Sequence, residues 1–276
     1  MEKRICLITG ATSGIGKATA TELARKGFHV VVTYRNSSKG EQTINEIKQI
    51  TGSELVEGME VDLESFDSIR KMAADFKNKY PKIDVLINNA GIWETKRFES
   101  KDGIEKTIAV NHLAPFLLTN LLLDWVKKGN NPRIVNVSSE AHRYANIDFE
   151  DIECKKKFGS MKAYGQSKLA NILFTKKLAK MLEGTGITVN CLHPGVVNTN
   201  LFDKFPSFMK SMMSGLLLTP EKGARTSIFL ATSDEFKSIS GQYFAKMKMK
   251  KSNDTSNNSD AAEKLWDISK DYVGLK

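Results

Sequence analysis

The stretch Ile5-Cys-Leu-Ile-Thr-Gly-Ala-Thr-Ser-Gly-Ile-Gly16 joins a short apolar run to a glycine-rich turn, and an amphipathic segment follows over residues 16–26. This order predicts a buried strand, a tight turn and a helix whose N-terminus can bind a pyrophosphate through backbone N–H groups. The glycines Gly10, Gly14 and Gly16 are spaced GxxxGxG, unlike the commoner GxGxxG of dinucleotide sites. A turn without a ligand is the alternative, but the strand before it and the helix after it favour a dinucleotide site.

Further apolar runs of strand length alternate with helix-length amphipathic segments along the chain. Short apolar strands that alternate with helices predict a parallel sheet buried on both faces, and right-handed crossovers make that sheet doubly wound. We therefore expect an α/β fold of the Rossmann type. The expected strands are residues 5–9, 29–33, 55–61, 85–88, 133–137, 188–193 and 242–244, and the expected helices are residues 16–26, 39–51, 65–79, 103–128, 161–183, 220–231 and 261–272.

Expected strands and helices alternate regularly to about residue 244, which leaves no room for a second domain. We expect a single NAD(P)-binding catalytic domain over residues 1–276, with a core over about 3–245 and a C-terminal extension over 246–276. Residues 141–160 and 200–219 are expected to be loops on the sheet. The polar, low-complexity stretch 252–259 is expected to be a loop or a disordered hinge.

The chain of 276 residues carries 41 Lys and Arg against 32 Asp and Glu, a formal net charge of +9. The basic residues are scattered except for Lys246-Met-Lys-Met-Lys-Lys251, and this run lacks the interleaved aromatic residues that stack on bases. We expect a solvated basic face and no nucleic-acid partner. The three cysteines, Cys6, Cys154 and Cys191, stand far apart without a CxxC pair, so reduced thiols and no metal site are expected.

The first apolar run is too short for a signal peptide, and no later run reaches the ~18 uninterrupted apolar residues of a membrane span. We therefore expect a cytoplasmic protein without a transmembrane segment, with peripheral membrane contact left open.

The residues after the expected second strand, Thr33-Tyr-Arg-Asn-Ser-Ser38, contain no carboxylate to hold an adenosine ribose. Arg35 stands in that place, and a guanidinium can form a bidentate hydrogen-bonded ion pair with a phosphate. Arg35, helped by neighbours such as Asn36, therefore predicts NADP(H) rather than NAD. A surface arginine beside an NAD site is the alternative.

Tyr164 and Lys168 lie four residues apart in an expected helix, so their side chains rise from one face. A phenol has an ordinary pKa of ~10, and an adjacent ammonium favours its ionised form. This pair is typical of a proton-transfer site. The pair Ser138-Ser139 follows an expected strand at the sheet edge where ligands collect, and a hydroxyl there can orient a carbonyl.

In combination, these motifs resemble the short-chain dehydrogenase/reductase family over about residues 3–245. The matching elements are residues 9–16, Asn88-Asn-Ala-Gly91, Asn111, Ser139, Tyr164-x-x-x-Lys168 and Pro194-Gly195. Further segments are similar to the retinol dehydrogenase branch of that family. They are Val110-Asn-His-Leu-Ala-Pro-Phe116, Ser167-Lys-Leu-Ala-Asn171, His193-Pro-Gly-Val-Val197 and Ala262-Glu-Lys-Leu-Trp266.

The resemblance implies a role for each catalytic residue. Tyr164 is the general acid/base, Lys168 modulates its pKa and contacts the cofactor ribose, and Ser139 orients the carbonyl. Asn111 holds a water molecule that links Lys168 to solvent. The full set of expected cofactor contacts is Gly10, Thr12, Ser13, Gly14, Ile15, Gly16, Arg35, Asn36, Asp62, Leu63, Asn89, Ala90, Gly91, Tyr164, Lys168, Val197 and Thr199.

We therefore expect an NADP-dependent oxidoreductase that moves a hydride between NADP(H) and an alcohol or carbonyl substrate. Residues 201–218 are rich in Met, Phe and Leu, which predicts a lid over an apolar pocket and a lipophilic substrate such as a retinoid, a steroid or a fatty aldehyde. A core helix or a subunit contact is the alternative for that segment. The alternative function is a catalytically silent nucleotide-binding regulator. The resemblance also implies a homodimer or homotetramer formed through helices 103–128 and 161–183.

Overall fold

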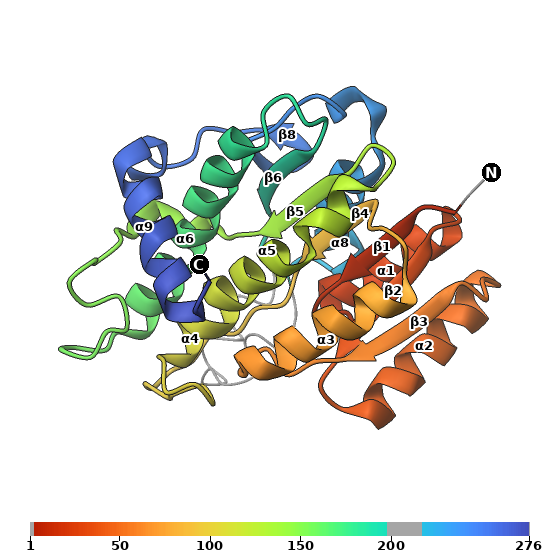
Figure 1. Cartoon of the computed structure of the whole chain (residues 1–276), viewed down its shortest axis with the longest axis horizontal. Coiled ribbons are helices and arrows are strands. Elements are labelled where there is room, and N and C mark those ends of the chain that lie inside the picture. Colours follow the sequence, from red (N-terminus) through yellow and green to blue (C-terminus); the bar gives the residue numbers. More distant parts are fainter. Residues whose placement is uncertain (1–2, 198–216, 276) are drawn as a thin grey trace.

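A computed structural model of the chain describes residues 3–197 and 217–275. These residues form an eight-stranded sheet in the order β3-β2-β1-β4-β5-β6-β7-β8, flanked by helices on both faces (Figure 1). All neighbouring strands pair in parallel except β7 and β8, which are antiparallel. The strand order reverses between β1 and β4, so the predicted doubly wound sheet is confirmed.

The strands are β1 (Ile5–Ile8), β2 (His29–Tyr34), β3 (Val56–Glu60), β4 (Val85–Asn88), β5 (Arg133–Val137), β6 (Thr188–His193), β7 (Tyr243–Ala245) and β8 (Lys248–Met249). The α-helices are α1 (Gly14–Arg25), α2 (Ser37–Thr51), α3 (Phe66–Lys79), α4 (Lys106–Ile108), α5 (Ala114–Lys127), α6 (Ser160–Met181), α8 (Pro220–Thr232) and α9 (Ser259–Val273). The shorter helical segments are η1 (Ala109–Leu113), η2 (Glu140–Tyr144), η5 (Asp234–Phe236) and η6 (Asp254–Asn257).

Two apolar cores lie on the two faces of the sheet. Within β1, Ile5 and Leu7 belong to the core under α3, α5, α6 and α9, whereas Cys6 and Ile8 belong to the core under α1, α2 and α8. Successive side chains of a strand point to opposite faces, so a strand that is covered on both sides must be apolar throughout. This is why β1 reads as an unbroken apolar run.

The helix expected over residues 103–128 is shorter and is not α-helical throughout. It begins at Lys106, where the Glu105 carboxylate accepts hydrogen bonds from the N–H groups of Thr107 and Ile108, and η1 is a π-helical turn between α4 and α5. Pro115 has no N–H to donate to the carbonyl of Asn111, so the regular α-helical ladder is interrupted there. The interruption lies at Asn111, one of the expected catalytic residues.

Of the two alternatives expected for residues 252–259, a loop or a disordered hinge, the structure has an ordered loop that contains η6. Asn253 donates to the backbone carbonyls of His142 and Ala145, and Ser252 and Ser256 are buried. The Asn258 side chain accepts hydrogen bonds from two backbone N–H groups and caps α9, which begins at Ser259. Polar residues in this stretch therefore satisfy backbone groups at turns and caps rather than solvate a free chain.

Helix α9 packs along α6, close to α5 (Figure 1). The ring of Trp266 lies 4.9 Å from the Phe116 ring on α5 and 6.0 Å from the Phe174 ring on α6, measured between centroids. Trp266 is buried as a result. Helix α9 therefore covers part of the α5–α6 face, through which a homodimer or homotetramer was expected to form.

Among the helices of residues 3–197 and 217–275, none has both the length and the apolar character needed to cross a membrane.

Candidate active site

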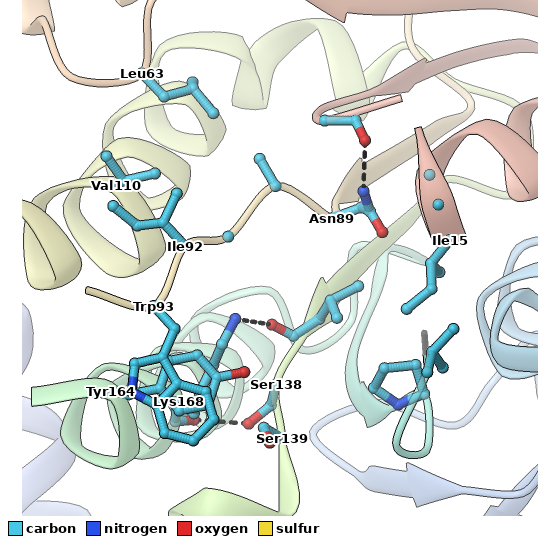
Figure 2. A pocket seen from close by; sticks show the side chains of 18 of the residues that line it. Ile15, Leu63, Asn89, Ile92, Trp93, Val110, Ser138, Ser139, Tyr164 and Lys168 are labelled. Atoms are coloured by element: carbon cyan, nitrogen blue, oxygen red, sulfur yellow. Dashed lines mark hydrogen bonds between the residues drawn. The ribbon is translucent and has the colours of Figure 1, made fainter. Parts of the chain in front are cut away.

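A cavity of about 680 Å³ opens at the carboxyl ends of the parallel strands, at the point where the strand order reverses (Figure 2). Ligands of doubly wound sheets bind at this position. Nearly all of the expected catalytic and cofactor-binding residues that the structure describes line this cavity; Asn36 and Asn111 do not. Residues 198–216, which include Thr199 and most of the expected lid, lie outside the described residues.

The glycine-rich turn leaves room for a ligand close to the backbone. Gly10 and Gly14 have φ angles of +65° and +52°, which glycine adopts without strain. A Cβ atom on Gly10 would lie 2.8 Å from the Cα atom of Ala90, and one on Gly16 would overlap the Gly10 carbonyl oxygen. The Ser13 side chain does not cap α1, so it leaves the first N–H groups of the helix free to bind an anion. These features fit the pyrophosphate of a dinucleotide.

The loop after β4 is tied to this turn. The Asn89 amide, labelled in Figure 2, donates to the carbonyl oxygens of Thr9 and Gly10 at 2.9 and 3.1 Å. The Thr9 hydroxyl accepts from the backbone N–H groups of Asn89 and Ala90. At the far end of the loop, a Cβ atom on Gly91 would lie 3.0 Å from the Nζ atom of Lys168. The motif Asn88–Gly91 therefore connects the glycine-rich turn with the expected proton-transfer residues.

Tyr164 and Lys168 both come from α6 and are buried. The Lys168 ammonium donates to the Val137 carbonyl at 3.2 Å, and burial lowers its pKa to about 8. Burial raises the pKa of Tyr164 to about 12, while hydrogen bonding to Ser139 acts in the opposite direction. The Lys168 Nζ atom lies 5.6 Å from the centre of the Tyr164 ring.

The sequence predicted that Lys168 would lower the Tyr164 pKa, whereas the surroundings of Tyr164 in the structure raise it. Removing the phenol from water penalises its ionised form, and this penalty exceeds the stabilisation that neighbouring groups provide. At neutral pH the Tyr164 hydroxyl is a protonated donor that faces the cavity.

The two adjacent serines have different surroundings. The Ser138 hydroxyl is buried and donates to the Lys168 carbonyl at 2.7 Å, which fastens α6 to the end of β5. The Ser139 hydroxyl accepts from the Ala141 N–H at the start of η2 and also interacts with the Tyr164 phenol. Ser139 is thus the member of the pair placed beside the Tyr164 hydroxyl.

Asn111 supports the loop that carries Ile92. Its side-chain oxygen accepts from the Ile92 N–H at 2.8 Å, and its amide donates to the Ile92 carbonyl and to the Ser167 hydroxyl. Asn36, expected to contact the cofactor, accepts from the Lys39 N–H and is the N-cap of α2. The expected water-holding role of Asn111 stays a prediction.

A carboxylate that sequence reasoning missed lies next to Arg35. The Arg35 guanidinium donates to the Glu64 carboxylate at 2.7 Å. In many dinucleotide sites such a carboxylate follows the second strand, whereas Glu64 follows β3. Glu64 also pairs with Lys106 at 2.9 Å. The neighbouring Asp62 is partly buried, which raises its pKa, but hydrogen bonds from Lys101 and from the Glu64 N–H outweigh burial and hold its pKa below the usual range.

Trp93 and His193 also line the cavity and were given no role from the sequence. The Trp93 ring stacks on Tyr164. Burial lowers the pKa of His193 to about 4, so its imidazole is neutral, and Nδ1 accepts from the Glu140 N–H at 3.3 Å. Both residues could have been found from the sequence by their position. His193 belongs to the motif His193–Val197, and Trp93 follows the motif Asn88–Gly91 by two positions.

This fold and this site define an oxidoreductase of the short chain dehydrogenase class. Residues 4–210 match the family described as short chain dehydrogenase, and the chain belongs to that family. The resemblance to the retinol dehydrogenase branch is confirmed as well. Human retinol dehydrogenase 14 is 40% identical over 294 aligned residues, covering 100% of this chain and 88% of that protein, and human retinol dehydrogenase 13 is 40% identical, covering 98% and 84%.

Solved structures show the same fold. A crystal structure of an uncharacterized protein from Mycobacterium paratuberculosis has a TM-score of 0.81 and 32% sequence identity, covering 99% of this chain and 94% of that one. A short chain dehydrogenase from Shigella flexneri complexed with NADP has a TM-score of 0.72 and 25% identity, covering 88% and 97%.

Proposed function

We propose that this protein transfers a hydride between NADP(H) and the carbonyl or alcohol group of a lipophilic small molecule, with Tyr164 as general acid/base. The observation that carries the proposal is the convergence of Ser139, Tyr164 and Lys168 on one cavity with the glycine-rich turn. A protein that only senses a nucleotide has no need of this proton-transfer set.

The cavity offers a place for each part of the cofactor. The turn from Gly10 to Gly16, which includes Thr12, Ser13 and Ile15, would hold the pyrophosphate. Asp62 and Leu63 would contact the adenine, and Arg35 the 2′-phosphate. Asn89, Ala90 and Gly91 would line the dinucleotide, Lys168 would contact the ribose, and Val197 would contact the nicotinamide side. When bound, the nicotinamide supplies or accepts the hydride.

The residues of this chain supply the proton and the orientation. In carbonyl reduction, the Ser139 hydroxyl orients the carbonyl oxygen, and the Tyr164 hydroxyl donates a proton to that oxygen as the hydride reaches the carbonyl carbon. The high pKa of Tyr164 keeps this donor protonated at neutral pH. The protonated phenol is the form that can donate a proton in carbonyl reduction.

The rim of the cavity supports a lipophilic substrate. Tyr144, Met161 and Val196 line the cavity and are 87%, 53% and 40% exposed. Exposed apolar side chains gathered at a site opening are typical of a surface that receives an apolar ligand. The names of the retinol dehydrogenase relatives agree with this proposal.

A turnover screen with NADPH and NADH against aliphatic, aromatic, steroid and retinoid carbonyls tests the proposal. We expect NADPH-dependent reduction that favours longer apolar substrates, with KM falling several-fold per added carbon because a buried methylene contributes ~0.8 kcal/mol. Tyr164→Phe is the matched control. Tight NADPH binding without turnover of any carbonyl class would instead support the silent regulator.

A cytoplasmic location belongs to the same proposal, whereas the homodimer or homotetramer expected through residues 103–128 and 161–183 does not. The cavity rim also offers an apolar surface for peripheral membrane contact. Association through α5 and α6 would require displacement of α9, so we expect that these helices do not form a subunit interface in the intact chain.

A further inference from the structure

The indole of Trp93 lies flat against the phenol of Tyr164. The ring centroids are 4.4 Å apart and the ring planes differ by 5° (Figure 2). Trp93 is partly exposed at the cavity wall, whereas Tyr164 is only 5% exposed. The indole therefore covers one face of the proton-transferring ring.

Trp93 is held in this position by a second contact with the same helix. Its Nε1–H donates to the Ser160 hydroxyl at 2.8 Å, and that hydroxyl donates to the Glu94 carbonyl at 2.7 Å. Ser160 precedes Tyr164 by one helical turn, so both lie on one face of α6. The indole is thus anchored on one turn of α6 and stacked on the next.

We propose that Trp93 is a positioning residue for Tyr164, holding the phenol ring in one orientation and excluding water from one of its faces. This inference rests on the proposed role of Tyr164 as general acid/base. Aromatic pairs have preferred ring geometries, so a stacked indole favours one orientation of the phenol ring. The hydroxyl is then presented to substrate beside Ser139.

The surroundings of the phenol leave burial as the main influence on its ionisation. Ser139 interacts with it from the end of β5, and Lys168 lies on α6 itself. Glu140, Tyr144 and His193 are the other titratable residues that line this part of the cavity among the described residues. Removing the indole would admit water to the phenol, and hydration favours the ionised form.

The test is a pH titration of Tyr164 by ultraviolet difference absorbance, each enzyme being compared with the same enzyme carrying Tyr164→Phe. In the unmutated background, Tyr164 should not ionise below about pH 11. In Trp93→Leu, we expect a midpoint near the ordinary value of ~10. Trp93→Phe keeps an aromatic ring and should behave as the unmutated protein. Trp125→Leu, which removes an indole from α5, is the matched control.

Turnover gives a second readout. Trp93→Leu should lower kcat roughly tenfold while the Kd for NADPH changes less than about twofold, because the indole acts on the tyrosine rather than on the cofactor. Ser160→Ala keeps the indole but removes its anchor, so it should lower the Tyr164 midpoint in the same direction. This milder variant serves if Trp93→Leu does not fold.

A Tyr164 midpoint that stays above about pH 11 in both Trp93→Leu and Ser160→Ala would overturn the inference. The titration needs neither cofactor nor substrate. Full activity of Tyr164→Phe would therefore refute the proposed function without altering the titration, and the two failures are distinguishable.

Discussion

The Arg35 guanidinium is paired with the Glu64 carboxylate at 2.7 Å, and both side chains line the end of the cavity where the adenosine would lie. The Arg35 side chain is nevertheless 68% exposed. A 2′-phosphate that binds Arg35 must therefore compete with a carboxylate already in place. We therefore expect any preference between the two cofactors to depend on this pair rather than on the arginine alone.

We expect Arg35→Ala to narrow a preference for NADPH over NADH by roughly ten- to a hundredfold, since a charge-assisted phosphate contact contributes ~1.5–3 kcal/mol. Glu64→Gln should strengthen NADPH binding several-fold and leave NADH binding nearly unchanged, because it removes a repulsive charge. Fluorescence titration measures both. Arg25→Ala, which breaks an arginine–glutamate pair elsewhere on the surface, is the control. Equal Kd values for the two cofactors in the unmutated protein would contradict the prediction.

Tyr164 and Lys168 should behave as one catalytic unit. Tyr164→Phe should lower kcat by ~10²–10⁴-fold while NADPH binding remains largely intact. Lys168→Ala should damage both, and the double variant should be little worse than Tyr164→Phe alone. Because burial lowers the pKa of Lys168 to about 8, its charge is present below that pH. NADPH affinity should weaken as the pH rises through this value. Additive losses in the double variant would argue against a shared role.

The adjacent serines should separate stability from turnover. Ser138→Ala removes a buried hydrogen bond to the Lys168 carbonyl and should lower the free energy of unfolding by about 1 kcal/mol. Ser139→Ala should instead lower kcat by at least about tenfold with little change in stability, because Ser139 lies beside the Tyr164 hydroxyl. Denaturant unfolding and steady-state kinetics on the same two proteins decide the matter. Equal kcat losses would show that the two hydroxyls are not distinguished.

Acid should destabilise the fold through His112, which is buried, and His193, which is partly buried. Burial lowers the pKa of both His112 and His193 from 6.5 to about 4. Between these pH values the unfolded chain binds more protons, so this contribution to stability is complete above 6.5 and is lost as the pH falls toward 4. At pH 5 the loss amounts to roughly 2 kcal/mol per histidine.

Urea unfolding at pH 7 and pH 5 measures this loss. In His112→Asn, the decrease in the free energy of unfolding from pH 7 to pH 5 should be smaller by roughly 2 kcal/mol, the contribution of one histidine. The same decrease in the variant and in the unmutated protein would show that His112 does not contribute.

Helix α9 should keep the chain monomeric through the α5–α6 face. Light scattering should give a mass near 30.8 kDa, that of one chain. Truncation after residue 258 exposes the apolar surface around Phe116 and Phe174 and should promote association or aggregation. Trp266→Phe, which keeps an aromatic ring against α5 and α6, is the control. An intact chain that dimerises through α5 and α6 would contradict the expectation.

Much of the fold and the central site could be predicted because the relevant patterns are local. The apolar run of β1, the glycine-rich turn and the four-residue spacing of Tyr164 and Lys168 each lie within a few residues. Their backbone geometry follows from strand and helix periodicity and from steric freedom at glycine. The doubly wound order then brings the strand ends, and with them Ser139, to one edge.

Contacts between distant segments were not predictable in this way. Glu64 reaches Arg35, and Trp93 reaches Tyr164, only because different strand ends meet at the same edge of the sheet. The four-residue spacing of Tyr164 and Lys168 predicted a lowered pKa for Tyr164, but burial of the phenol raises this pKa. Spacing along a helix determines which side chains are neighbours, whereas desolvation depends on everything that the folded chain packs around them.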